Sequence, residues 1–412
     1  MSILYTHILA VFYIPRTIVV KICGVFLVLI IVLLPCIFYL DVDVDIMIRR
    51  KSTYANDTEK IKTILYWTKM FYDKNFYFGE GKIFRNCAVP TCYGTHERDF
   101  LEKLEDYDAI LFHGIELNVS DIPISRSSRQ RYIFVNMESP ANWRLDNNYV
   151  PDGFYNWTMT YRMDSDIPRP YGNIVNKKTK EIVYPVRDHE VVNHKEVEAY
   201  VDLIKSRNST KLEVSKKSPD NCKVRTAAWF VSHCNTVSDR ERYVAELQRY
   251  VDVDVYGNCG AGKCQSNDDR CYEMLESRYH FYLSFENSLC EDYVTEKLYK
   301  VMRYNLVPIV FGAANYSKFV PPRSYINVAD YESPRHLARH LLDLRSNDIE
   351  YEKYFWWKEF YEVDLGHDST LCRMCEMLHR NEMSSPEVIV GLKDWWTKGQ
   401  CRDSREFFKK IT

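Results

Sequence analysis

The stretch from Phe281 to Lys300, FYLSFENSLCEDYVTEKLYK, places charged side chains directly after an apolar run. A helix beginning at Asp292 would advance about 100° per residue, which brings Tyr293, Glu296 and Lys297 within one arc of its first turns. The N–H groups and dipole at such a helix start favour an anion. A lysine there can neutralise a phosphate, and a glutamate can accept hydrogen bonds from sugar hydroxyls. The alternative is a solvated helix face with ordinary ion pairs, and periodicity alone does not separate the two.

A second candidate of this kind lies earlier in the chain. Arg240 follows the apolar run RTAAWFVSH, and Ser238-Asp-Arg-Glu241 has the spacing of a capping box that begins a helix. Two helix starts, one carrying an arginine and one a lysine, could hold the two phosphates of a nucleotide-sugar. Taken alone, Arg240 fits a solvated residue of a first helical turn equally well.

Strand and helix candidates alternate along the chain and would position these residues. Apolar strands are predicted at 63–67, 107–114, 131–137, 225–233, 251–257, 280–287, 306–312 and 324–328. A helix is predicted after Ser333-Pro334, a cap followed by a proline in the first turn. This alternation predicts an α/β fold with parallel, doubly wound sheets, in which ligands bind at the carboxyl ends of the strands. The polar stretch 205–222 separates two such halves, so we expect a cleft between them.

An uncharged run from Ile22 to Leu40 is long enough to cross a bilayer once. It ends in bulky residues before Asp41, which favours a retained anchor over a cleaved signal peptide. Arg16 and Lys21 precede the run and favour a cytoplasmic N-terminus. Eleven cysteines and five N-x-S/T sequons follow it, as is typical of a body in an oxidising secretory lumen. The sequons, which are candidate N-glycosylation sites, are at Asn56, Asn118, Asn156, Asn208 and Asn315.

Charge and short motifs argue against other classes of function. The net charge of −2, without a long basic block, makes a nucleic-acid partner an unsuitable hypothesis. The loop GNCGAGKC (257–264) resembles a phosphate-binding loop, but Cys264 stands where Ser or Thr must bind magnesium. A disulfide-tied loop is the better interpretation. Asp252 and Asp254 share one face of a strand and could bind a metal ion, although a solvated strand end is the commoner reason for such a pair.

The pair Cys372 and Cys375 lacks a second ligand pair at the spacing of a zinc site. A structural disulfide is therefore predicted, and proximity in the sequence suggests the pairs Cys372–Cys375 and Cys87–Cys92. An odd number of cysteines after the anchor leaves at least one unpaired or joined to another chain.

Several stretches together resemble the α1,3-fucosyltransferase family. The run FYLSFENSxxxDYVTEKL is similar to that family's donor-binding signature, and other matching stretches occur in the family's order. They are VNMESP (135–140), FYNWTMTYRMDSDIPRPYG (154–172), AAWFVSH (227–233), VDVYG (253–257), LVPIVFG (306–312) and FVPPRSYINVADYESP (319–334). The anchor followed by a short stem also resembles the type II Golgi members of the family.

The resemblance implies a GT-B fold, with two Rossmann-like domains facing a cleft, and inverting transfer of fucose from GDP-fucose. An inverting transfer needs a base on the acceptor side and charge stabilisation at the diphosphate. By resemblance, the base is Glu138 of the ESP stretch. The donor-binding residues would be Arg240, Asn287, Tyr293, Glu296 and Lys297. The residues that line or brace the acceptor side would be Asn156, Trp157, Arg162 and Asp164. A metal is not expected to be obligatory, although Mn²⁺ or Mg²⁺ could stimulate.

The expected layout runs from a cytoplasmic tail to a lumenal catalytic body at the Golgi membrane. Its parts are a tail (1–21), an anchor (22–40), a stem (41–60), an acceptor-side domain (61–205), a GDP-fucose-binding domain (220–345) and a helical, disulfide-bonded C-terminal segment (346–412). The acidic Glu291-Asp292 and Cys234 resemble core-type members from invertebrates and plants, which favours a GlcNAc of glycoprotein N-glycans as acceptor. An antennal, Lewis-type or LacdiNAc acceptor and a non-catalytic glycan-binding protein are the alternatives.

Overall fold

The computed structural model describes residues 60–145, 150–186, 223–264, 268–380 and 387–408. The predicted tail, anchor and stem, and the sequons at Asn56 and Asn208, lie outside these ranges and stay predictions. Within them, no helix combines the length and the apolar character that a membrane crossing requires.

Five strands of the N-terminal half form a parallel sheet in the order β2-β1-β3-β4-β5. They are β1 (Lys62–Tyr66), β2 (Cys92–Thr95), β3 (Ala109–His113), β4 (Arg131–Asn136) and β5 (Trp157–Thr160). Every residue of these strands is buried, as expected for a parallel sheet covered on both faces. The sequence predicts β1, β3 and β4 from their apolar runs. The short β2 and β5 carry more polar residues and were not predicted.

A second parallel sheet follows, in the order β12-β11-β10-β8-β9. Its strands are β8 (Arg225–Phe230), β9 (Val253–Tyr256), β10 (Tyr279–Phe285), β11 (Val307–Phe311) and β12 (Ile326–Asn327). The helices between and after them are α3 (Arg240–Leu247), α4 (Asp269–Arg278), α5 (Glu296–Met302), α6 (Pro334–Arg345) and α7 (Asp348–Glu352). Four of the five strands lie within the predicted ranges, and β10 begins one residue earlier than predicted, at Tyr279. The predicted α/β class with parallel sheets is confirmed. The cap of α6 is also confirmed, because the Ser333 side chain accepts a hydrogen bond from the His336 N–H.

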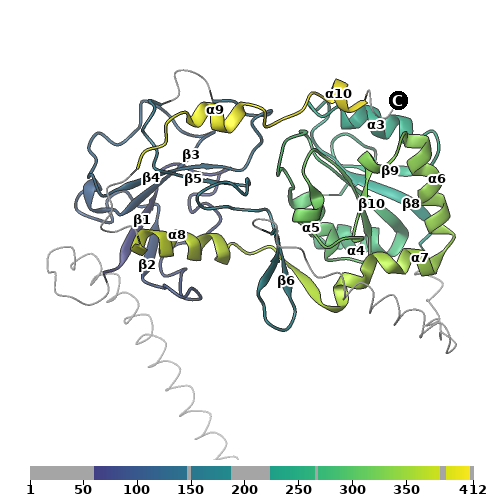
Figure 1. The fold of residues 1–412 in the computed structure, drawn as a ribbon, viewed down its shortest axis with the longest axis horizontal. Helices are drawn as coiled ribbons and strands as arrows, with labels where there is room; N and C mark the ends of the chain where they lie inside the picture. Colours follow the sequence, from purple (N-terminus) through teal and green to yellow (C-terminus); the bar gives the residue numbers. More distant parts are fainter. Residues whose placement is uncertain (1–59, 146–149, 187–222, 265–267, 381–386, 409–412) are drawn as a thin grey trace, which may run out of the picture.

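The chain after the second sheet returns to the first. An antiparallel sheet of β6 (Asn173–Asn176), β7 (Ile182–Tyr184) and β13 (Tyr361–Asp364) joins the two regions. The remaining helices are α8 (Asp368–Arg380), α9 (Leu392–Thr397) and α10 (Ser404–Phe408), and the 3₁₀ turns are Leu104–Asp106, Tyr316–Lys318, Val328–Asp330 and Lys353–Glu359. Figure 1 shows α8 and α9 beside the first sheet, on the left, and α10 beside α3 on the right. The C-terminal segment therefore contacts both halves.

Two disulfides attach α8 to the first sheet, and their pairing differs from the prediction. Cys87 bonds to Cys372, and Cys92 bonds to Cys375. The predicted pairs, Cys372–Cys375 and Cys87–Cys92, are wrong. The two cysteines of α8 lie one helical turn apart, and both side chains project from the same face of the helix towards the segment that leads into β2. Proximity along the sequence therefore gave no information about the partner.

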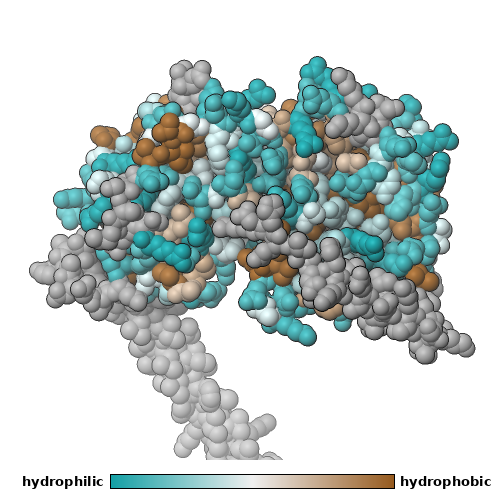
Figure 2. Space-filling view, viewed as in Figure 1, coloured by the Kyte–Doolittle hydropathy of each residue, from teal (hydrophilic) through white to brown (hydrophobic). Residues whose placement is uncertain are grey.

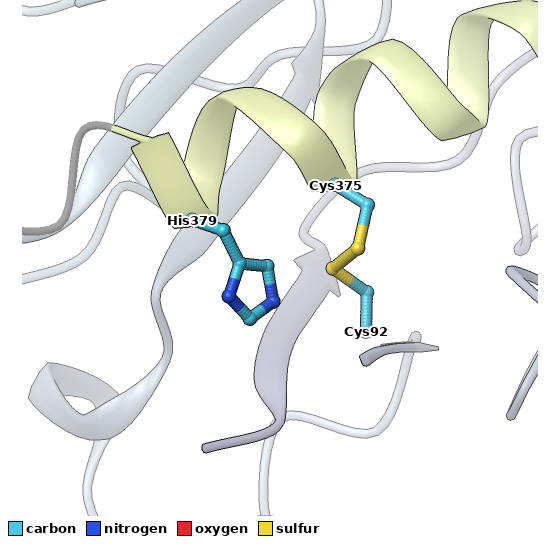
Figure 3. Close-up of side chains that lie close together, drawn as sticks. All are labelled: Cys92, Cys375 and His379. Atoms are coloured by element: carbon cyan, nitrogen blue, oxygen red, sulfur yellow. A yellow bond between two sulfur atoms is a disulfide. The ribbon is translucent and has the colours of Figure 1, made fainter. Parts of the chain in front are cut away.

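His379 lies on the same helix as Cys375 and near the disulfide that Cys375 forms with Cys92, as Figure 3 shows. The His379 Nε2 atom lies 3.1 Å from Thr91 Oγ1 and 3.2 Å from the Thr91 carbonyl oxygen. Because both sulfurs are joined to each other, neither is a thiolate that could bind a metal ion. The group is a structural attachment of α8.

Three further disulfides lie in the second half. The pairs Cys234–Cys259 and Cys264–Cys271 confirm that the loop at 257–264 is tied by disulfides rather than shaped for phosphate. The pair Cys290–Cys401 connects the donor-like stretch to the C-terminal segment. The Asp252 carboxylate accepts hydrogen bonds from Thr226, and Asp254 accepts them from Arg225 and Tyr279.

The surface is mostly hydrophilic, with an apolar patch near α9 (Figure 2). The exposed Val388 and Val390 directly precede that helix. They adjoin a small hollow whose lining includes Leu145, Val150 and Leu392. Two charged residues, Asp152 and Lys393, also line the hollow, and Asp152 accepts a hydrogen bond from the Gly391 N–H.

The two disulfides of α8 close nearly the same loop, with sequence separations of 285 and 283 residues. With one in place, the other closes only a short additional ring. Replacing Cys87 and Cys372 by alanine is therefore expected to lower the free energy of unfolding by about 3 kcal/mol. Replacing all four cysteines opens the long loop and is expected to cost more than twice that amount. Urea denaturation measures the free energy of unfolding of three variants: one without Cys87 and Cys372, one without Cys92 and Cys375, and one without all four cysteines. A loss in the fourfold variant equal to the sum of the two paired losses would contradict the expectation.

Candidate active site

The two parallel sheets come together where β4 and β10 end. Glu138 lies two residues after β4, and its Oε2 accepts a hydrogen bond from the Tyr293 hydroxyl at 3.3 Å. The same oxygen accepts one from Asn142 Nδ2 at 3.2 Å. The structure thus places the predicted base directly beside the predicted donor stretch, although 155 residues separate Glu138 from Tyr293 in the sequence.

A chain of hydrogen bonds with a buried centre joins the same two segments. The Asn142 N–H donates to Ser139 Oγ at 3.3 Å, and Ser139 Oγ lies 2.6 Å from Ser288 Oγ. Ser288 in turn donates to Asn287 Oδ1 at 2.9 Å, which leaves Ser139 as the donor to Ser288. Ser139 and Ser288 are fully buried. Because a buried hydroxyl without a partner is costly, this chain holds the Glu138 loop and the FENS stretch in one register.

Three tyrosines pack around Glu138. The ring of Tyr293 lies 4.9 Å from that of Tyr161 and 6.3 Å from that of Tyr171, and the Tyr171 hydroxyl donates to the Met137 carbonyl oxygen. Burial raises the pKa of Tyr293 well above its ordinary value, and the negative charge of Glu138 adds to this effect. The Tyr293 hydroxyl therefore stays protonated and acts as a hydrogen-bond donor to the carboxylate.

Lys297 forms the positive part of the site. Its Nζ lies 2.8 Å from Thr295 Oγ1, 3.3 Å from Glu286 Oε2 and 3.4 Å from Glu296 Oε1. Burial alone would lower the pKa of Lys297, but the carboxylates of Glu286 and Glu296 outweigh burial and raise it. Conversely, burial would raise the pKa of Glu296, and Lys297 overcomes this and lowers it. Lys297 is therefore a cation at neutral pH.

The start of α5 differs from the prediction. The helix begins at Glu296, with Thr295 as the N-cap, so Tyr293 precedes the helix and does not share a helical arc with Lys297. Asp292 has φ of 57°, a left-handed conformation that interrupts a helix there. The Thr295 N–H donates to Glu286, and the Lys297 N–H donates to Thr295 Oγ1. These first-turn N–H groups thus have partners within the protein and are not free for an anion.

Arg240 is placed at the start of α3, as predicted, but it is 2% exposed. Its guanidinium donates to the carbonyl oxygens of Phe285 and His233 and to the Glu241 carboxylate. It thereby ties the end of β10 to the loop after β8. Its positive charge still acts on the site, because it is one of the influences that lower the pKa of Lys297.

The predicted capping box at Ser238–Glu241 is wrong. The Ser238 hydroxyl donates to the Glu286 carbonyl oxygen at 2.8 Å, and the Glu241 carboxylate accepts from Thr236. Asp239 occupies the N-cap position with φ of 55° and makes no capping bond. The polar side chains of this turn are used to connect it to β10 instead of to cap α3.

Comparison with known proteins shows which family the chain belongs to. The family model "Fucosyltransferase, N-terminal" matches residues 59–172, and "Glycosyltransferase family 10 (fucosyltransferase) C-term" matches residues 221–395. Alpha-(1,3)-fucosyltransferase C of Drosophila melanogaster is 37% identical over 357 residues, which cover 84% of this chain and 79% of that protein. The chain belongs to glycosyltransferase family 10, the fucosyltransferases. The resemblance inferred from the motifs is confirmed, and the protein is a glycosyltransferase.

Two further likenesses are weaker or shorter. Glycoprotein 3-alpha-L-fucosyltransferase A of Drosophila melanogaster is 36% identical over 320 residues, covering 75% of this fucosyltransferase but only 55% of the relative. A crystal structure of an α1,3-fucosyltransferase with GDP-fucose has a TM-score of 0.43 and 15% identity, covering 82% of this chain and 95% of the other.

The four residues predicted for the acceptor side of this fucosyltransferase bond mainly to its own framework. Arg162 and Asp164 pair with each other, and both bond to Trp395 of α9. The buried Asn156 accepts from the Tyr132 N–H at 2.8 Å and donates to the Glu387 carbonyl oxygen at 2.9 Å. Trp157 is a buried residue of β5. These contacts assign bracing roles, and contact with an acceptor stays a prediction.

The sequons within the described ranges fall into two kinds. Asn118 and Asn315 are exposed, as an attached glycan requires. Asn156 is buried, and both ends of its amide are hydrogen-bonded, so a glycan there is incompatible with this structure. The sequon at Asn156 was recognisable as part of a core motif, and its amide serves the fold.

Glu286 is the functional carboxylate that the sequence analysis did not single out. It follows β10 directly and is 1% exposed, yet it contacts both Thr295 and Lys297. The available signal was its position at the carboxyl end of a predicted central strand, where a buried charge needs a reason.

The serine chain predicts coupled stability. Ser139→Ala and Ser288→Ala should each lower the free energy of unfolding of this fucosyltransferase by about 1–2 kcal/mol, because each leaves a buried polar group without its partner. The double variant should lose less than the sum, with a coupling of about 1 kcal/mol. Urea denaturation of the full double-mutant cycle measures this coupling. Ser128→Ala, at an exposed position, serves as the control, and fully additive losses would refute the coupling.

Proposed function

We propose that this fucosyltransferase transfers fucose from GDP-fucose, with inversion and in α1,3 linkage, to a GlcNAc residue of glycoprotein N-glycans. The observation that carries the proposal is the 3.3 Å contact between Glu138 Oε2 and the Tyr293 hydroxyl. It brings the carboxylate that follows β4 against the stretch that leads into α5, whose second residue is Lys297. An inverting transfer requires a base and charge compensation at the diphosphate.

The proposed overall layout is GT-B, with the first sheet serving the acceptor and the second serving the donor. Support comes from two five-stranded parallel sheets whose carboxyl ends contribute the residues described above. In open α/β sheets, ligands bind at those ends.

In the proposed reaction, Glu138 accepts the proton of the acceptor hydroxyl. The oxygen of that hydroxyl forms a bond to the anomeric carbon while the bond from this carbon to the diphosphate oxygen breaks. The bonding electrons leave with GDP, and the Lys297 ammonium compensates the negative charge that develops there. Arg240 adds positive potential from its buried position, and Tyr293 orients the base. Asn287, Tyr293 and Glu296 are the proposed neighbours of the nucleotide-sugar.

These cationic side chains perform the charge compensation for which other nucleotide-sugar enzymes use a metal ion. We therefore propose that no metal is obligatory and that Mn²⁺ or Mg²⁺ acts at most as a stimulant. Residues 22–40 are proposed as a single-pass type II anchor that places the catalytic body in the Golgi lumen, consistent with five disulfides in the described chain.

The acceptor is proposed to be a core GlcNAc. The chain is 36% identical to a relative named as a glycoprotein 3-alpha-L-fucosyltransferase. It is 32% identical to human proteins named 4-galactosyl-N-acetylglucosaminide 3-alpha-L-fucosyltransferase. The higher identity favours a glycoprotein acceptor, and the choice of a core GlcNAc rests on Glu291-Asp292 and Cys234, which resemble core-type members.

An acceptor panel tests this choice. The full chain in detergent is incubated with GDP-fucose and with core N-glycans, LacNAc or LacdiNAc, with and without a chelator, and products are identified by mass spectrometry. We expect fucosylated core glycans and at most a twofold effect of chelation. Transfer to LacNAc alone would replace the core acceptor by an antennal one. Glycan binding without transfer would favour a glycan-binding protein, and equal transfer from other nucleotide-sugars would refute the GDP-fucose assignment.

The base assignment has its own test. Glu138→Gln is expected to reduce kcat about 10²–10⁴-fold, because the amide cannot accept the hydroxyl proton. GDP affinity, measured by calorimetry, should change less than threefold. Glu102→Gln removes an exposed carboxylate from the same half of the protein and serves as the matched control. Near-full activity of Glu138→Gln would show that another group is the base.

A further inference from the structure

Glu286 is a buried carboxylate that contacts only donors in the site. Its Oε1 accepts from the Thr295 N–H at 2.8 Å, and both oxygens lie within 3.0 Å of Thr295 Oγ1. Its Oε2 lies 3.3 Å from Lys297 Nζ. A protonated carboxyl group would need an acceptor for its own O–H, and these partners offer donors. Burial raises the pKa of Glu286, while the Lys297 charge and the Thr295 hydrogen bonds oppose this rise. Because the surrounding groups donate, we describe Glu286 as an ionised carboxylate bound by charge-assisted hydrogen bonds.

The backbone of Glu286 is fixed as firmly as its side chain. Its N–H donates to the Phe311 carbonyl oxygen at the end of β11, at 2.9 Å. Its carbonyl oxygen accepts from the Ser238 hydroxyl at 2.8 Å. The carboxylate therefore has little freedom to move, and it fixes the position of the ammonium that it contacts.

Thr295 links the two charges. Its hydroxyl donates to Glu286 and accepts from Lys297 Nζ at 2.8 Å. Glu286, Thr295 and Lys297 thus form a closed network at the junction of β10 and α5. The network sets the direction in which the lysine side chain leaves the helix.

The two carboxylates near Lys297 differ in their surroundings. The side chain of Glu296 is 42% exposed, so solvent screens its charge, whereas that of Glu286 is 1% exposed. Arg240, at the start of α3, disfavours the charged form of Lys297 by like-charge repulsion. Glu286 is accordingly the main group that balances the burial of Lys297.

We propose that Glu286 is a positioning residue that holds the Lys297 ammonium ready for the diphosphate of the nucleotide-sugar. This inference rests on the proposed function, because it takes a nucleoside diphosphate as the ligand of Lys297. It goes further because it makes the donor site a preformed unit, built from the end of β10 and the start of α5. In this unit the phosphate-binding charge is present before the ligand arrives. Glu286 itself does not touch the ligand.

The test compares two ligands that differ only in the diphosphate. GDP and guanosine affinities of the full-length protein in detergent are measured by calorimetry for wild type and Glu286→Gln. Glutamine keeps an acceptor for the Thr295 N–H but removes the charge. We expect the affinity for GDP to fall about tenfold or more, as for loss of a charged hydrogen bond, and guanosine affinity to stay unchanged.

The pH dependence gives an independent readout. Without the Glu286 charge, burial and Arg240 act on Lys297 with only Glu296 opposing them, so its pKa falls. As the pH rises, Lys297 then loses its proton, and with it its charge, at a lower pH than in wild type. The decline of GDP affinity on the alkaline side should therefore begin at a lower pH in Glu286→Gln than in wild type.

Controls separate positioning from a merely structural role. Glu291→Gln removes an exposed carboxylate from the same stretch and should leave GDP affinity unchanged. In a Lys297→Met background, Glu286→Gln should have no further effect on GDP. Equal losses for GDP and guanosine, or a full additional loss in the Lys297→Met background, would overturn the proposal. If Glu286→Gln does not fold, Glu286→Asp provides the test, because the shorter side chain moves the negative charge away from Lys297. It must then lower the affinity for GDP and leave the affinity for guanosine unchanged.

The outcomes also distinguish the two levels of proposal. A wild-type protein that binds GDP but transfers no fucose would refute the proposed function and leave the role of Glu286 intact. Fucose transfer with unchanged GDP affinity in Glu286→Gln would refute the role of Glu286 alone.

Discussion

Burial of charge between two sheet ends is the constraint that organises this protein. The side chain of Glu286 is 1% exposed and that of Lys297 beside it is 21% exposed, so an unpaired ion would be unfavourable at this site. Each therefore has a partner, and Glu138 likewise has Tyr293. Because these partners come from different strands and loops, the charges are stable only when β4, β10 and the start of α5 are all in place. The fold and the site thus depend on the same contacts.

The loops at the ends of β4 and β10 serve the site by being rigid. The Ser139–Ser288 bond at the centre of this chain is fully buried, so it cannot be replaced by water without opening the contact between the halves. Arg240 adds a second tie, from α3 to the end of β10. In the proposed inverting transfer the base and the leaving group lie on opposite faces of one sugar carbon, and such ties limit relative movement there.

Sequence reasoning succeeded where a signal is local and failed where a tertiary partner decides. Continuous apolar runs predict β8, β10 and β11, since a strand buried on both faces must be apolar throughout. Motif resemblance correctly identified the family, and the structure places Glu138 from one matching stretch beside Tyr293 from another. The start of α5 was missed because Thr295 becomes its cap only with Glu286 beside it. Likewise, cysteine spacing cannot tell which face of α8 docks on the first sheet, and that docking determines the pairing.

The Cys290–Cys401 bond has a consequence for how the enzyme matures. Cys401 is synthesised 111 residues after Cys290, and the segments around them also exchange backbone hydrogen bonds, Glu291 with Gln400 and Arg402 with Leu289. The stretch around Cys290 therefore reaches its final shape late, once the downstream segment has been synthesised and the disulfide has formed. Until then Cys290 is a thiol open to mispairing, which makes thiol–disulfide exchange a step on the route to the folded enzyme.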